Sequence, residues 1–166
     1  MVLKEYEPLI VNVIKQLCED SHFSQTTKYK QHGNISIYEH SIAVAYTSCW
    51  IASKLYFNVD YTTLIRGALL HDYFLYDWHE RNNEHRLHAF SHPRKAMQNA
   101  CEDFKLTSKE ENIILRHMFP LTPIPPYYLE SWIVCVADKY CALKETLRID
   151  DIQVKKCIGA YQYDFK

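Results

Sequence analysis

The sequence of 166 residues contains very little glycine, with three residues at positions 33, 67 and 159. Phosphate-binding loops of the G-x-G-x-x-G and Walker A types need closely spaced glycines, so both are excluded. A turn-rich β-sandwich normally contains more glycine, and segments that alternate apolar and polar residues are also missing. The scarcity of glycine therefore argues against dinucleotide-binding folds, P-loop folds and β-sandwiches.

The chain also has little net charge and no long apolar run. Its formal charge is −1 with neutral histidines, which argues against a broad surface for nucleic acid or anionic lipid. No apolar run approaches the ~18 residues of a membrane-spanning helix, and the N-terminus lacks the pattern of a signal peptide. We therefore expect a cytoplasmic protein that uses neither a membrane nor a broad nucleic-acid surface.

The cysteines include no C-x-x-C pair, although there are six of them. Most lie in apolar helical surroundings, as in SWIVCVADKYCA. A helical chain of this size does not need disulfides, so we expect reduced, buried thiols. The apolar share of 48% and charged share of 23% indicate a globular protein with a real core.

Helical periodicity covers most of the chain and predicts an all-α fold. The predicted helices cover about residues 5–20, the segment 35–57, residues 61–75, a helix that begins at Ser91 or His92, residues 107–117 and residues 127–147, and Asp150 can cap a last one. The segments 24–34 and 76–90 are predicted to be irregular. No repeat or domain-scale linker interrupts the chain, so residues 1–166 are predicted to form one compact bundle of six to seven helices.

Local signals support several of these helix starts. Asp60 is a good N-cap for the helix from Tyr61. Thr107 and Glu110 form a T-x-x-E capping box. Pro93 suits the first position of its helix, where a missing N–H costs nothing.

Polar residues occupy inward positions on four of the predicted helices. His40, Asp72, His117 and Asp138 each lie three or four residues from apolar residues of a buried face. A single inward histidine is more often a hydrogen-bonded core residue than a ligand. Several together are hard to satisfy separately, and each would cost on the order of a few kcal/mol if buried without a partner. One shared cation, or two, satisfies them together.

His71 and Asp72 are adjacent, so on a helix they point about 100° apart and cannot chelate as an i,i+4 pair does. They converge on one ion if it lies beside the helix end. Because a carboxylate has two oxygens, Asp72 could also bridge two metals.

His40, the pair His71–Asp72 and Asp138 resemble the H…HD…D signature of the HD superfamily of metal-dependent phosphohydrolases. The order, the helical setting and the spacings match over about residues 36–145, which would be the core of an HD domain with helical extensions at both ends. His92 in SHPRKA and His117 in ILRHMFP resemble the second-metal histidines of binuclear members. The resemblance implies a first metal on His40, His71, Asp72 and Asp138, and a second on His92 and His117, with Asp72 bridging.

The resemblance implies hydrolysis of a small phosphoester, with a nucleotide as the expected substrate. The attacking group would be a bridging hydroxide that two metals activate and Asp72 positions. Four imidazoles and two carboxylates favour two divalent transition metal ions, Fe, Mn or Zn, over Mg. The same six ligands also serve diiron oxygenases of the superfamily, and a non-catalytic module that senses metal or nucleotide is the third reading. The ligand set is also similar to that of the HD-GYP phosphodiesterases, which have a lysine three residues beyond the HD pair. This chain has Leu75 there and lacks the GYP motif, so cleavage of cyclic dinucleotides by the route of that family is not expected.

Substrate contacts are predicted more broadly than the ligands. Arg94 and Lys95 follow His92 at a helix start, where N–H groups favour anions. The candidate substrate residues are Arg94, Lys95, Arg116, Lys139, Trp78, Arg81, His85, Arg86 and His88. Aromatics among them could stack on a base and cations could hold phosphate. His88 lies four residues before His92 and is the alternative metal ligand if His92 does not bind. The expected partner is a small phosphoester or nucleotide, and a homo-oligomer is compatible with the sequence.

Overall fold

The computed structural model describes residues 3–19, 21–32, 34–75, 88–147 and 149. In chain order they form α1 (Leu3–Glu19), the 3₁₀-helix η1 (Phe23–Lys28), β1 (Lys30–His32), β2 (Ile35–Ser36), α2 (Ile37–Lys54), α3 (Tyr61–Leu70), α4 (His88–Asp103), α5 (Ser108–Arg116) and α6 (Leu129–Thr146). Strand is limited in this part of the chain to the short antiparallel pair β1–β2. The prediction of an all-α fold is confirmed.

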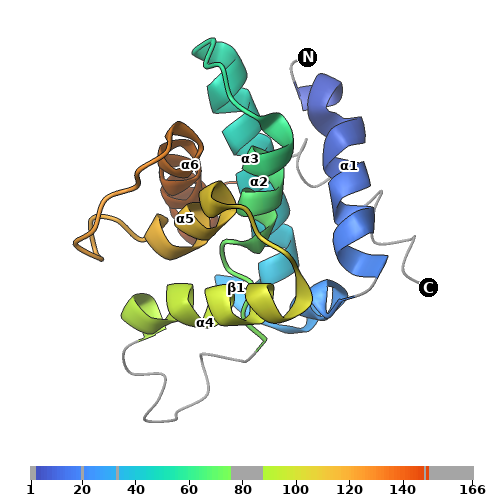
Figure 1. Ribbon diagram of the computed structural model, residues 1–166, viewed down its shortest axis with the longest axis vertical. Helices are drawn as coiled ribbons and strands as arrows, with labels where there is room; N and C mark the ends of the chain where they lie inside the picture. Colours follow the sequence, from blue (N-terminus) through green and yellow to red (C-terminus); the bar gives the residue numbers. More distant parts are fainter. Residues whose placement is uncertain (1–2, 20, 33, 76–87, 148, 150–166) are drawn as a thin grey trace.

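The helices pack around a central pair, α2 and α3 (Figure 1). Helix α1 covers one side of this pair, and α5 and α6 cover the other, while α4 crosses one end of the bundle. Gly67 lets α3 approach α5 closely, because a Cβ at that position would lie 2.3 Å from Cδ1 of Ile113. The chain that leaves α3 is fixed to α4, since the side-chain amide of Asn99 donates to the carbonyl of Tyr73 at 3.0 Å.

Two predicted helix caps are confirmed. The Asp60 carboxylate accepts from the N–H groups of Thr62 and Thr63 at the start of α3. Thr107 and Glu110 form the predicted capping box at α5. A second box, Ser36 with Glu39, begins α2 directly after the strand pair. Both helices that follow these boxes carry a candidate ligand at or near an end, so the caps help to place the site.

Several predicted boundaries are wrong. Helix α3 ends at Leu70 rather than near Leu75, which leaves His71 at its C-cap and Asp72 beyond it. Helix α4 begins at His88, so residues 88–90 are not irregular and Pro93 lies inside the helix. The predicted helical segment 35–57 is also too long, because α2 ends at Lys54, and Leu55 at its C-cap is 58% exposed.

The segment 24–34 is also more regular than predicted. It contains most of η1 and all of β1, and the N–H of Ile37 donates to the carbonyl of Tyr29 at 2.9 Å. The residues in these backbone pairs have mixed polarity, so the segment has no apolar periodicity from which η1 and β1 could be predicted. The predicted cap at Asp150 and residues 76–87 lie outside the described residues. Within the described residues, we find no helix with both the length and the apolar character needed to cross a membrane.

Candidate metal centre

Two candidate ligands lie at the C-terminal ends of helices. His71 is the C-cap of α3 and His117 is the C-cap of α5. The Nδ1 atom of His71 donates to the carbonyl of Ala68 at 2.7 Å, and Nδ1 of His117 donates to the carbonyl of Ile114 at 2.8 Å. These carbonyls have no partner in the regular helix pattern, so the bonds satisfy them. In both rings Nε2 is left facing the interior, as a metal ligand requires.

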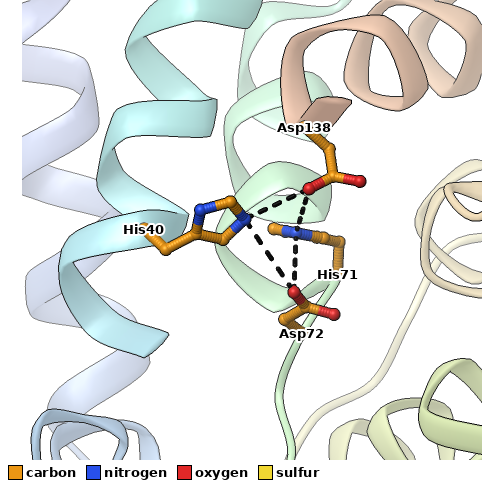
Figure 2. A group of neighbouring side chains, drawn as sticks. All are labelled: His40, His71, Asp72 and Asp138. Carbon is orange, nitrogen blue, oxygen red and sulfur yellow. Dashed lines mark hydrogen bonds and ion pairs between the residues drawn. The ribbon is translucent and has the colours of Figure 1, made fainter. Parts of the chain in front are cut away.

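The first group contains His40, His71, Asp72 and Asp138, all of them buried. Figure 2 shows His40 of α2 reaching toward Asp138 of α6 and toward the HD pair after α3. Nε2 of His40 lies 3.1 Å from Oδ1 of Asp138 and 3.9 Å from Oδ2 of Asp72. Nε2 of His71 lies 3.2 Å from Oδ2 of Asp72 and 3.6 Å from Oδ1 of Asp138.

The second group contains Asp72, His92 and His117, which are also buried. Oδ1 of Asp72 lies 3.2 Å from Nε2 of His92 and 3.3 Å from Nε2 of His117. The two histidine Nε2 atoms are 2.8 Å apart. Asp72 therefore belongs to both groups, with Oδ2 facing the first and Oδ1 facing the second.

The spacing of these atoms fits metal coordination. Ligand atoms that are each 2.0–2.2 Å from one ion lie roughly 3.0–3.5 Å apart around it, and most contacts in both groups are close to that range. Nε2 of His71 and Oδ1 of Asp72 are buried without a well-aligned hydrogen bond among the described residues, and each faces other members of the two groups. Buried polar atoms are normally paired, so these two have the surroundings expected of ligand atoms.

The pKa values describe what holds the first group together without metal. Burial alone would lower the pKa of His40, but hydrogen bonds with Asp138 and Glu145 outweigh it and raise the pKa to about 9. His71 is likewise buried, and the charge of Asp72 with a hydrogen bond to Asp138 holds its pKa well above 6.5. Burial opposes the charge of Asp72, yet the neighbouring His71 and His92 hold its pKa well below 3.8.

The second group has a different electrostatic character. Burial lowers the pKa of His117 from 6.5, and its neighbours His71 and His92 oppose its charge further. A neutral imidazole is the form that binds a metal. His117 is therefore ready to coordinate near neutral pH, while His40 and His71 must first lose protons.

Sequence reasoning missed two residues that contact the ligands. The Glu145 carboxylate accepts from Nδ1 of His40, with its Oε2 at 2.9 Å. Glu145 follows Asp138 by seven residues, so the helical period could have placed both on one face. Gln31 of β1 donates through Nε2 to Oδ2 of Asp72 at 2.5 Å. No periodic signal identifies Gln31, because a strand pairing brings it to the site.

The predicted substrate residues that the structure describes do not gather at one place, in contrast to the candidate ligands. Arg94 is exposed and Arg116 is half-buried. Nζ of Lys139 donates to the carbonyl of His117 at 2.7 Å, so this lysine turns toward the end of α5. Lys95 lines a cleft of about 220 Å³ together with Leu75, Gln98, Asn99 and Glu102. Trp78, Arg81, His85 and Arg86, and the side chain of His88, lie outside the described residues.

Comparison with known proteins found one family. The family described as HD domain matches residues 37–143, which include all six candidate ligands. No curated protein and no solved structure matches the chain.

Proposed function

The chain belongs to the HD-domain family, the superfamily of metal-dependent phosphohydrolases, and from this premise we propose that it hydrolyses a small phosphoester at a two-metal centre. The proposed ligands of the first ion are His40, His71, Asp72 and Asp138, and those of the second are Asp72, His92 and His117. The donor set of imidazoles and carboxylates suits Fe, Mn or Zn.

The observation that carries the proposal is the shared position of Asp72. Its two oxygens face different groups of ligand atoms at 3.2–3.3 Å and 3.2–3.9 Å, so one carboxylate can serve two ions. Two divalent ions against the carboxylates of Asp72 and Asp138 leave a net positive charge, which favours an anionic ester. Bound metals would polarise phosphoryl oxygens and lower the pKa of a bound water.

The protein's own residues orient the ligands. Glu145 fixes the ring of His40, and backbone carbonyls fix those of His71 and His117. Such outer contacts set the tautomer and direction of each ring. Burial of every ligand limits bulk water and strengthens electrostatic interactions within the site.

The cleft beside Leu75 is the proposed place for the rest of the substrate. Leu75 lies three residues after Asp72, and Lys95 lies three residues after His92 on α4, so the cleft is close in sequence to both metal groups. Its volume of about 220 Å³ is below the ~300–1,000 Å³ of sites for drug-sized ligands. A small phosphoester or nucleotide phosphate, with Lys95 as the cationic contact, fits this cleft best.

The function is tested on protein purified without oxygen, by metal analysis and by hydrolysis of p-nitrophenyl phosphate, bis-p-nitrophenyl phosphate and dinucleoside polyphosphates. We expect about two transition metal ions per chain and metal-dependent release of product. His92→Gln should lower the metal content by about one ion and abolish hydrolysis.

His22→Gln is the matched control, because His22 is exposed and bonds Asp103 away from both groups. Two bound irons with an oxygen-sensitive visible spectrum and no hydrolysis would contradict the proposal and favour an oxygenase. Bound metal with neither reaction would favour a sensing module.

A further inference from the structure

The outward face of α6 is apolar along its whole length. Its large exposed side chains, with their exposed fractions, are Leu129 (40%), Trp132 (40%), Val136 (54%), Tyr140 (50%), Leu143 (59%) and, at the C-cap, Leu147 (60%). They follow one another at three or four residues and, at 100° per residue, occupy an arc of about 80°. We call these six residues the α6 stripe. A helix face exposed to water is normally polar, so a continuous apolar stripe marks an interaction surface.

The stripe lies opposite the candidate metal centre. Asp138 and Glu145 of the same helix both contact His40 in the interior, and they are about 160–180° around the helix from Leu129. A partner on the stripe would therefore leave both metal groups accessible.

We propose that the α6 stripe is the interface of a homodimer in which α6 of one copy packs against α6 of the other. A second copy presents the same stripe by symmetry, as a two-fold interface requires. No charged residue lies within the stripe itself, and the Lys144 ammonium lies at its edge, 5.3 Å from the centroid of the Tyr140 ring. Lys139, which is exposed beside it, directs Nζ to the carbonyl of His117.

The surface area of the α6 stripe is large enough for an interface with a second copy of the chain. Helix α6 is 18 residues long, which is about 27 Å. Six side chains that each expose roughly half of their surface offer about 500 Å² per copy. Two copies then bury about 1,000 Å², the lower limit for a specific interface, before any contribution from neighbouring residues.

The oligomeric state of the full chain tests this proposal. Light scattering after size exclusion should give twice the chain mass of 19.7 kDa at micromolar concentration. The double variant Val136→Glu, Leu143→Glu should be monomeric and keep the wild-type metal content, because both side chains are exposed.

Leu55→Glu is the matched control, since Leu55 is equally exposed at the end of α2 and its variant should remain dimeric. A monomeric wild-type chain would overturn the proposal and leave the stripe to another segment or another protein. A dimer that survives both charged substitutions would also overturn it.

A second inference concerns Gln31 and rests on the proposed metal centre. The Gln31 side chain is 7% exposed, and its bond to Oδ2 of Asp72 is its one hydrogen bond among the described residues. Its Oε1 atom is buried without a partner. A glutamine placed only to satisfy the core would pair both ends, because an unpaired buried polar atom costs about 1–3 kcal/mol.

The geometry points to Gln31 as a positioning residue for the shared carboxylate. Its amide holds Oδ2 toward His40 and His71, and this keeps Oδ1 directed at His92 and His117. Without the amide the carboxylate could rotate out of the bridging orientation. Gln31 thereby controls whether Asp72 serves two ions or one.

Manganese-loaded protein gives a readout independent of activity, because two bridged Mn²⁺ ions couple magnetically and separate ions do not. Gln31→Met keeps the size but removes the donor, and it should bind Mn²⁺ 10–100-fold more weakly and lose much of the coupled signal. Gln31→Glu, which places a carboxylate against Asp72, should also bind more weakly. Gln16→Met on the exposed face of α1 is the control.

Wild-type affinity and coupling in a folded Gln31→Met chain would overturn the assignment. Tighter binding by Gln31→Glu would overturn it as well, since the residue would then act as a direct ligand. If the wild-type chain itself shows no coupled pair, the failure lies with the two-metal centre and not with Gln31.

Discussion

Asp72→Asn is expected to empty both metal groups, so that the metal content falls from about two ions per chain to well below one. The asparagine side chain keeps the size of aspartate but loses its charge, and its amide nitrogen cannot coordinate. Oδ1 and Oδ2 of Asp72 face different groups, so a single change weakens both. Loss of a residue that only hydrogen-bonds a metal ligand lowers activity by up to ~100-fold. The rate of hydrolysis should fall by more than this in Asp72→Asn, because Asp72 is itself a proposed ligand.

Metal analysis and hydrolysis of the same purified samples measure this effect. Asp60→Asn is the matched control, because Asp60 caps α3 and asparagine is an equally good N-cap. It should retain both metals and full activity. A folded Asp72→Asn chain with unchanged metal content would refute the site assignment, whatever its activity.

The candidate ligands could be proposed from sequence because most of them lie on a helix with a clear apolar period or directly follow one. Asp138, for example, follows Val134 by four residues and precedes Cys141 by three, so it had to face inward. The structure brings His40, His71, Asp72 and Asp138 into one group and His92 and His117 into another with Asp72. Convergence of several inward polar residues was therefore a stronger signal than any one of them.

Helix ends were harder to predict than helix faces. Apolar residues continue past Leu70 to Leu75, so periodicity extends the helix, whereas α3 in fact ends where His71 bonds the carbonyl of Ala68. This ending gives the HD pair its geometry, since the chain turns directly after the C-cap. Contacts from the strand pair, such as Gln31 to Asp72, depend on tertiary placement and leave no local pattern.

In the proposed metal centre, protons and metal ions would compete for the same atoms of the first group. Without metal, the raised pKa values of His40 and His71 and the lowered values of Asp72 and Asp138 describe a buried cluster of opposite charges. The opposite charges in this cluster compensate one another, which explains why the fold can bury them. A metal must displace the protons on these histidines, so pH should act oppositely on the metal-free and metal-loaded protein.

The free energy of unfolding of the metal-free chain is expected to fall as pH rises from 6.5 to above 9. The pKa of His40 rises from 6.5 to about 9 on folding, so its stabilising contribution is complete below pH 6.5 and disappears as pH passes 9. Its size is roughly 3 kcal/mol at 1.36 kcal/mol per pKa unit. His71 shifts in the same direction. The lowered pKa values of Asp72 and Asp138 add stability above pH 3.8 that is lost in acid.

Urea unfolding across this pH range, with EDTA and with saturating Mn²⁺ under anaerobic conditions, separates the two states. Metal affinity should increase over the interval in which the metal-free chain loses stability, by up to tenfold per pH unit for each proton displaced. Glu145→Gln removes a carboxylate that raises the pKa of His40, so its alkaline loss of stability should be smaller and should be complete at a lower pH than in the wild type. A metal-free chain whose stability stays constant or rises between pH 6.5 and 9 would contradict the charged cluster, and with it the view that protons hold the first group until metal replaces them.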